Sequence, residues 1–178
     1  MNHLGADERG VVVWFTGLPS SGKSTLAEAV RQRLLAADRA CVLLDGDDVR
    51  AALVPAPGHD EAGRTAFYRT LAQLAALLAQ QRLIVLVAAT ANRRTYREEA
   101  RRLAPRFVEV FLDVPLATCQ ARDAKGLYAR AAAGELSQLP GAGAAYEPPP
   151  APDMVARGVE DAASIAALLT SGRIHATP

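Results

Sequence analysis

The chain has 178 residues with a formal net charge of +1, and half of its residues are apolar. A single domain over residues 1–178 with a sizeable core is expected at this length, and a disordered or acidic-tail protein is excluded. The near-neutral charge, with no dense Lys/Arg run, argues against a nucleic-acid partner. Of the twenty basic residues eighteen are arginine, and only Lys23 and Lys125 are lysine. The surroundings of these two lysines are therefore of particular interest.

The sequence also bears on where the protein works. No apolar run approaches the roughly eighteen residues of a membrane span, and the first ten residues lack the apolar segment of a signal peptide. Cys41 and Cys119 form neither a CxxC pair nor a metal cluster, and both lie in apolar patterns. We expect a cytoplasmic protein without membrane contact, in which both cysteines are reduced core residues.

Buried strands and amphipathic helices alternate along the chain. In chain order, the patterns predict a strand at 11–16, a helix at 23–37, a strand at 41–44, a helix at 63–81, a strand at 83–88, a helix at 93–103, a strand at 107–112, a helix at 115–122, a short edge strand at 154–157 and a helix at 159–170. This alternation predicts an α/β fold, with a parallel sheet and helices on both of its faces.

Residues 123–153 break the alternation, because they contain several glycines and the run Pro148 to Pro150. A long irregular stretch inside a compact domain is either disordered or functional. We predict that this stretch forms a lid over a binding site.

The strongest signal is a complete G-x-x-x-x-G-K-S motif between the first strand and the first helix. Its glycines allow backbone N–H groups to point at phosphate oxygens, and the helix N-terminus adds a partial positive charge. Lys23 would reach the β- and γ-phosphates, and the Ser24 hydroxyl would bind Mg²⁺. The motif predicts a P-loop NTPase fold that binds Mg-ATP. The candidate ATP-binding residues are Gly17, Ser20, Ser21, Gly22, Lys23, Ser24 and Thr25.

A P-loop predicts nucleotide binding and leaves the reaction open. The N-K-x-D motif expected of a GTPase is missing, and the chain is too short for a large mechanical ATPase. A small-molecule kinase fits best. The alternative from another class is a nucleotide-binding regulatory module without turnover.

The second strand ends in L-D-G-D-D-V-R, residues 44–50. Open parallel sheets bind ligands beyond the carboxyl ends of their strands, so Asp45 is expected near the γ-phosphate, where it would orient Mg²⁺ or accept a hydroxyl proton. Asp47 or Asp48 is expected to cap the next short helix, with a functional role as the alternative. Arg50, about one turn further, is suited to an anionic acceptor.

These motifs resemble those of the adenylylsulfate kinases, in which a similar P-loop is followed by L-D-G-D-N-x-R. The stretch 109–116, EVFLDVPL, is similar to the family's E-V-F-V-x-x-P-L. The stretch 119–128, CQARDAKGLY, matches its C-E-x-R-D-x-K-G-L-Y, and residues 146–148 match its Y-E-x-P. The resemblance covers about residues 11–153.

The resemblance implies transfer of the γ-phosphate of ATP to the 3′-hydroxyl of adenosine 5′-phosphosulfate, in sulfate assimilation. It also implies that Arg122 lies over the bound nucleotide, that Lys125 contacts the substrates as the lid closes, and that Arg50 and Arg64 hold the phosphosulfate. Lys23, Asp45 and Lys125 are then the candidate catalytic residues. A homodimer is expected by analogy with the family.

The departures from the family lie in the acceptor half. Gly58 stands where the family has a Phe that stacks on the acceptor adenine, Phe67 stands at an Asn position, and Thr90 or Ala91 stands at a Ser position. Phe67 or Tyr68 could supply substitute stacking, although the helical spacing places Phe67 among core residues. A kinase of a different small anionic alcohol is therefore the first alternative. The candidate substrate contacts are Asp47, Arg50, Arg64, Phe67, Thr90 and Lys125.

Other charged and aromatic residues have simpler interpretations. Arg94, Arg97 and Arg101 share one helical face, which we expect to be solvated and to pair with Glu98. His59, in a Pro/Gly-containing loop, is expected to be solvated. Trp14 in the first strand is expected in the core.

Overall fold

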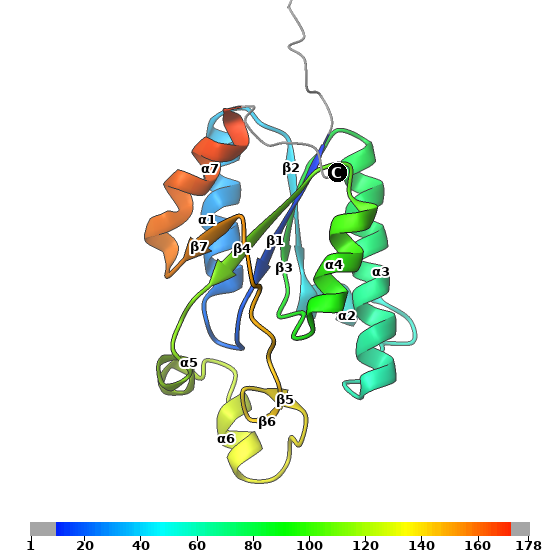
Figure 1. Ribbon diagram of the computed structural model, residues 1–178, viewed down its shortest axis with the longest axis vertical. Helices are drawn as coiled ribbons and strands as arrows, with labels where there is room; N and C mark the ends of the chain where they lie inside the picture. The colour runs from blue at the N-terminus through cyan, green and yellow to red at the C-terminus, as the bar shows by residue number, and fades with distance from the viewer. Residues whose placement is uncertain (1–9, 172–178) are drawn as a thin grey trace, which may run out of the picture.

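A computed structural model of the chain describes residues 10–171, and within them five parallel strands form one sheet between helices (Figure 1). The expectation about a signal peptide concerns residues that lie almost entirely outside this range. The strand order is β2-β3-β1-β4-β7. The predicted α/β fold is confirmed. The strands are β1 (Val11–Thr16), β2 (Cys41–Asp45), β3 (Ile84–Ala88), β4 (Phe107–Leu112) and β7 (Met154–Ala156), and β5 (Leu139–Pro140) pairs with β6 (Gly143–Ala144) in a separate ribbon.

The helices divide between the two faces of the sheet, with α1 and α7 on one side and α3 and α4 on the other (Figure 1). The helices are α1 (Lys23–Ala36), α2 (Gly46–Ala52), α3 (Glu61–Gln80), α4 (Arg94–Leu103), α5 (Leu116–Arg122), α6 (Leu127–Ala132) and α7 (Ala162–Thr170). The closing helix predicted at 159–170 is split, because Val159–Asp161 form a 3-10 turn before α7.

The central strand β1 is buried on both faces, which explains its uninterrupted apolar sequence. Val13 and Phe15 pack in the cluster beneath α1 and α7. Val12 and Trp14 point to the opposite cluster, beneath α3 and α4. Trp14 has no exposed surface, so its predicted core position is confirmed.

Helix α3 turns a different face to the core than its leucine spacing predicts. Phe67 and Leu71 are buried as expected, whereas Leu74 and Leu78 are only half-buried. Alanines take the inner positions instead, and their small side chains allow close packing against the sheet and α4. These alanines are Ala72, Ala75, Ala76 and Ala79. The helix also begins two residues earlier than predicted, because Asp60 caps it by accepting a hydrogen bond from the Gly63 amide at 2.7 Å.

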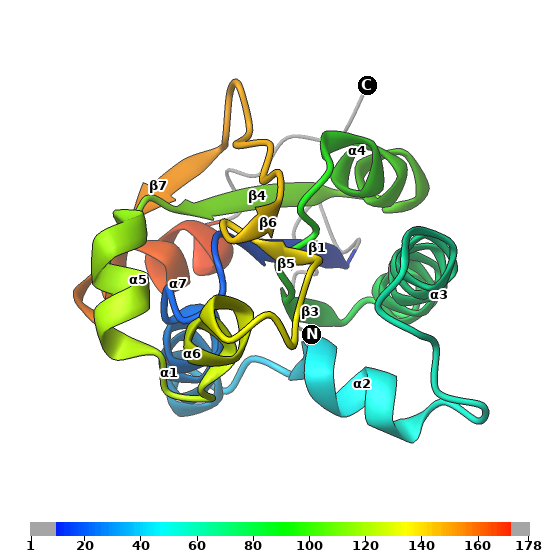
Figure 2. The ribbon, with the colours of Figure 1, turned by 90° about the horizontal axis from the view of Figure 1, so that it is seen from below.

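All strands of the sheet run in the same direction, so their carboxyl ends meet at one edge. Figure 2 looks onto this edge and shows α6, β5 and β6 lying across it. The stretch 123–153 that lacks a periodic pattern therefore contains a short helix and a small ribbon, placed where a lid was predicted.

The two cysteines are free thiols. Cys119 is buried as expected, while Cys41, on the edge strand β2, is only half-buried. Within residues 10–171, no helix combines the length and the apolarity that crossing a bilayer requires.

Gly10, directly before β1, offers a test of how tightly this sheet packs. A Cβ atom at Gly10 would lie 2.1 Å from the Ala79 carbonyl oxygen and 2.5 Å from that of Leu83. Because both are backbone atoms, Gly10→Ala should lower the free energy of unfolding by about 1–3 kcal/mol, measured by urea denaturation. Gly58→Ala is the matched control, since its Cβ would meet no atom closer than 3.5 Å. Equal stability of the two variants would contradict this packing.

Candidate active site

The loop between β1 and α1 has the backbone of an anion site. Ser20 and Gly22 both have positive φ angles, 60° and 98°, and the curl they produce brings the chain into α1. Gly22 occupies the N-cap position, where it has no side chain to bind the first amides of the helix. These amides and the positive end of the helix dipole are therefore available to a phosphate.

Lys23 lies inside this loop. Its Nζ donates hydrogen bonds to the carbonyl oxygens of Gly17, at 3.1 Å, and Leu18, at 2.7 Å. Burial lowers the pKa of Lys23 to about 8, against the opposing influence of neighbours that include Asp47 and Asp45. A bound polyphosphate would bring further negative charge to this ammonium group and so offset the effect of its burial.

Ser24 and Asp45 meet at the start of α1, where the Ser24 hydroxyl donates to Oδ2 of Asp45. Within residues 10–171, no group of three or more His, Cys, Asp or Glu side chains could hold a metal ion. Mg²⁺ in phosphate-binding sites usually has one or two protein oxygens and completes its shell with phosphate and water. A hydroxyl beside a carboxylate fits that requirement.

The capping prediction for Asp47 and Asp48 is wrong. Asp45 is the N-cap of α2, and its Oδ1 accepts a hydrogen bond from the Asp47 amide at 2.9 Å. Strand β2 extends one residue further than predicted, so the last residue of the strand is also the cap of the helix. The side chain of Asp47 is thereby left for another role.

Asp47 forms an ion pair with Lys125, from the loop between α5 and α6. Both side chains are largely exposed, 69% and 60%, so the pair contributes little stability. The hydrogen bond with Asp47 raises the pKa of Lys125, with further help from the charges of Asp47, Asp45 and Asp48. Both lysines of the chain therefore lie at the carboxyl edge of the sheet, as their motifs predicted.

Two side chains from the stretch 119–128, Arg122 at the end of α5 and Tyr128 in the lid, contact the P-loop. Arg122 Nη1 donates to the Ser21 carbonyl oxygen at 3.3 Å. The hydroxyl of Tyr128 donates to the Pro19 carbonyl oxygen at 3.1 Å. Burial raises the pKa of Tyr128 to about 12, so the hydroxyl remains a donor. The sequence assigned no role to Tyr128, although it ends the K-G-L-Y match that was recognised.

Arg50 on α2 and Arg64 on α3 bring positive charge to the region beside the lid. Arg50 Nη1 donates to the carbonyl oxygens of Pro57, at 2.8 Å, and Gly58, at 2.9 Å. Arg64 Nη2 donates to the carbonyl oxygen of Gln138 in the lid. The pKa of the exposed His59 is lowered, first by partial burial and then by the charges of Arg50 and Arg64. These three side chains form a region suited to an anion.

Of the predicted substrate contacts, Phe67 lies in the core and Thr90 lies beside the P-loop. Phe67 is 2% exposed and packs in the core, as its helical spacing predicted. The alternative prediction, that its ring stacks on the acceptor, is therefore wrong. Thr90 is half-buried, and its carbonyl oxygen accepts a hydrogen bond from Thr16 Oγ1 at 2.7 Å. Because Thr16 directly precedes the P-loop, this bond ties the loop after β3 to the nucleotide site.

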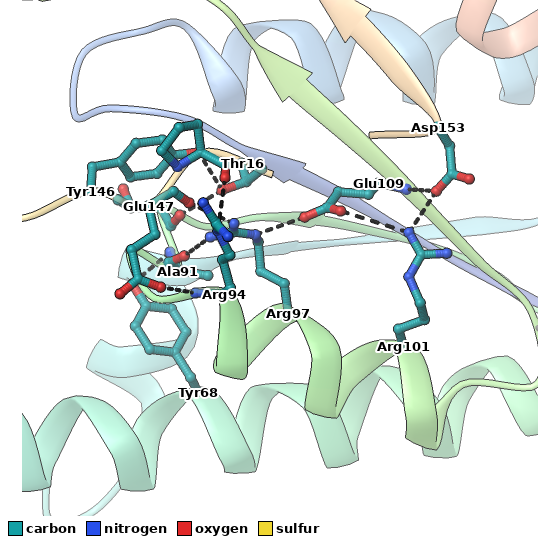
Figure 3. A network of polar contacts seen from close by, with 12 residues as sticks. Thr16, Tyr68, Ala91, Arg94, Arg97, Arg101, Glu109, Tyr146, Glu147 and Asp153 are labelled. Atoms are coloured by element: carbon teal, nitrogen blue, oxygen red, sulfur yellow. Dashed lines mark hydrogen bonds and ion pairs between the residues drawn. The ribbon is translucent and has the colours of Figure 1, made fainter. Parts of the chain in front are cut away.

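The expectation of a solvated arginine face on α4 is wrong for Arg97, whereas Arg94 is exposed as expected (Figure 3). Arg97 is 3% exposed, and its Nε donates to Oε1 of Glu109 at 2.7 Å. Its two other nitrogens donate to the carbonyl oxygens of Ala91 and, at 2.6 Å, Glu147. Arg101 binds Oδ2 of Asp153 at 2.8 Å. Glu109, Glu147 and Asp153 lie 12 or more residues away along the chain, so helical spacing alone did not indicate them.

The last part of the lid, residues 145–153, leads back to β7 and is held in place by the same network; we call it the return segment. Asn92 Nδ2 donates to the Ala145 carbonyl oxygen at 2.9 Å, and the Glu147 amide donates to the Asn92 carbonyl oxygen at 2.8 Å. The hydroxyls of Tyr146 and Thr16 are 3.0 Å apart. The return segment thus contacts both the loop after β3 and the strand that leads into the P-loop.

Removal of Arg97 should test whether this buried pair supports the return segment. Among residues 10–171, Arg97→Met leaves the buried Glu109 carboxylate with only the longer contact to Arg101, at 3.7 Å, so we expect a loss of about 3–5 kcal/mol in the free energy of unfolding. Hydrogen exchange should also become faster at the amide of Glu147. The exposed Arg102 on the same helix is the control, and Arg102→Met should change stability by less than about 0.5 kcal/mol. Similar effects of the two substitutions would contradict the network.

The lowered pKa of Lys23 predicts a pH dependence of stability. A lysine whose pKa is lower in the folded state destabilises that state below pH 8, and the penalty shrinks as the pH rises from 8 toward 10.5. Between pH 7 and 9.5, the wild-type protein should therefore gain stability relative to Lys23→Met in denaturation without nucleotide. A difference that stays constant over this range would show that Lys23 has an ordinary pKa.

Known proteins share both the sequence and the fold. The sequence model described as adenylylsulphate kinase matches residues 9–157. The adenylyl-sulfate kinase of Aeromonas hydrophila is 43% identical over 177 residues, covering 96% of this chain and 90% of that protein. The adenylyl-sulfate kinase of Paraburkholderia xenovorans is 45% identical over 148 residues, 83% of each protein.

The solved structure of the Mycobacterium tuberculosis APS kinase in complex with AMPPNP and APS is similar with a TM-score of 0.85 and 38% identity. The match covers 92% of this chain and 99% of that one. The resemblance inferred from the P-loop and the R-D-x-K-G-L-Y segment is thereby confirmed, and the chain belongs to the adenylylsulphate kinase family.

Proposed function

We propose that this protein transfers the γ-phosphoryl group of ATP to the 3′-hydroxyl of adenosine 5′-phosphosulfate. The observation that carries the proposal is that a complete phosphate-binding loop and two arginines, Arg50 and Arg64, lie at the same edge of the sheet, where the ion pair between Lys125 and Asp47 links the lid to α2. Adenylyl-sulfate kinases that are 43% to 45% identical to this chain support the choice of acceptor.

The donor half binds ATP through the P-loop. The amides at the start of α1 and the Lys23 ammonium surround the phosphates, and Arg122, bonded to the Ser21 carbonyl, covers the loop. Ser24 and Asp45 would hold Mg²⁺, which neutralises charge on the phosphate oxygens when bound. This half needs no rearrangement of the backbone, because the loop already has its curled conformation.

The acceptor half orients the hydroxyl and its anionic group. Arg50 and Arg64 bind the phosphosulfate, and the Asp45 carboxylate is placed to accept the hydroxyl proton. The loose transition state of phosphoryl transfer spreads charge over the equatorial oxygens, and Lys23 and Lys125 stabilise it from two sides. The lid excludes water from the transfer.

A kinase of another small anionic alcohol is the second candidate, favoured by the altered residues Gly58 and Phe67. A binding module without turnover is less consistent with this site, since Lys23, Ser24 and Asp45 lie together as transfer requires. We also expect the protein to work in the cytoplasm, where its two thiols stay reduced. The homodimer stays a prediction.

A panel of acceptor alcohols with labelled ATP tests the function. The wild-type protein should phosphorylate adenosine 5′-phosphosulfate in preference to sugar acids and nucleosides. Lys23→Ala should reduce the rate by at least about a hundredfold, because it removes a cation from the transition state. Arg102→Met, on the exposed face of α4, should retain the wild-type rate.

Two outcomes would contradict the proposal. Product from another alcohol, with none from adenosine 5′-phosphosulfate, would identify a diverged kinase. ATP binding without transfer to any acceptor in the panel would indicate the binding module.

A further inference from the structure

The guanidinium of Arg50 lies on the face of a buried aromatic ring. Its Cζ is 3.8 Å from the centroid of Phe67, a residue that is 2% exposed. A guanidinium in this arrangement is attracted to the ring quadrupole, and its in-plane N–H groups remain available to an anion. Nη1 is occupied by the carbonyls of Pro57 and Gly58, while Nε and Nη2 form no hydrogen bond within residues 10–171.

Phe67 is itself held in a series of rings. Tyr68 meets its ring edge-on, with centroids 5.2 Å apart, and stacks on Tyr96 at 4.7 Å. The Tyr68 hydroxyl accepts a hydrogen bond from the Ala91 amide at 3.0 Å (Figure 3). Because Ala91 follows Thr90, the rings connect Arg50 with the loop after β3. The platform beneath Arg50 is therefore fixed by packing on several sides.

Arg50 also lies near other positive charge. The positive charges of Arg50 and Arg64 lie near His59, whose pKa they lower together with partial burial. The charges of Arg50 and Arg64 repel one another, so a support that holds Arg50 in place has a clear physical purpose.

We infer that Phe67 is a positioning residue, which holds the Arg50 guanidinium toward the anionic group of the acceptor and does not touch the acceptor itself. The inference rests on the proposed function, because it assigns Arg50 to that anion.

Phe67→Leu removes the aromatic face and leaves an apolar side chain. It should raise the KM for adenosine 5′-phosphosulfate about tenfold, with the KM for ATP within about twofold of wild type. Phe107→Leu is the matched control. Phe107 begins β4, is 3% exposed in the same core cluster, and has the Arg101 guanidinium 4.8 Å from its ring centroid. This control should leave both KM values near those of wild type.

A double-mutant cycle separates positioning from a general loss of packing. With Arg50→Ala as background, Phe67→Leu should change the acceptor KM by less than about twofold, because the residue through which it acts is gone. Additive effects of the two substitutions, or an equal rise in the acceptor KM for Phe107→Leu, would overturn the inference. A wild-type protein that does not phosphorylate adenosine 5′-phosphosulfate would instead refute the proposed function, and the inference with it.

Discussion

The parallel pairing of β1 with both of its neighbours is the constraint on which the site depends. Val13 lies opposite Leu86 of β3 and Val108 of β4, so three strands end together at the same edge. A parallel connection has to cross a face of the sheet, which is why helices cover both faces and the loops gather at the carboxyl ends. The hydrogen bond from Thr16 to Thr90 spans 74 residues of sequence and follows directly from this register.

A buried charge provides the second constraint, because Arg97 can stay in the core only when its donors are satisfied. Its partners come from the loop after β3, from β4 and from the segment that returns from the lid. At its other end, the lid begins with Asp123, whose carboxylate accepts hydrogen bonds from the amides of Tyr128 and Ala129, both at 3.0 Å. The lid is thus anchored to the core where it returns to β7, and its contacts across the edge include the buried bond from Tyr128 to Pro19 and the exposed pair of Lys125 with Asp47.

Local patterns predicted most of the fold and the donor half of the site. The apolar run of β1 and the motif around Lys23 needed only neighbouring residues, and both were placed correctly in the fold. Arg97 was misplaced because helical spacing treats an arginine as solvated, and its partner Glu109 stands in a strand identified by apolar residues. The contact of Arg64 with Gln138 joins residues 74 positions apart, a distance that no local pattern reaches.

The two halves of the site also differ in what their chemistry requires of the sequence. A phosphate bound by successive amides needs one backbone conformation, so the residues of the P-loop follow a strict motif. An anion bound by arginines needs only that each guanidinium be held in place, and different supports can do this. Here Arg50 rests on Phe67 and is fixed by the carbonyls of Pro57 and Gly58.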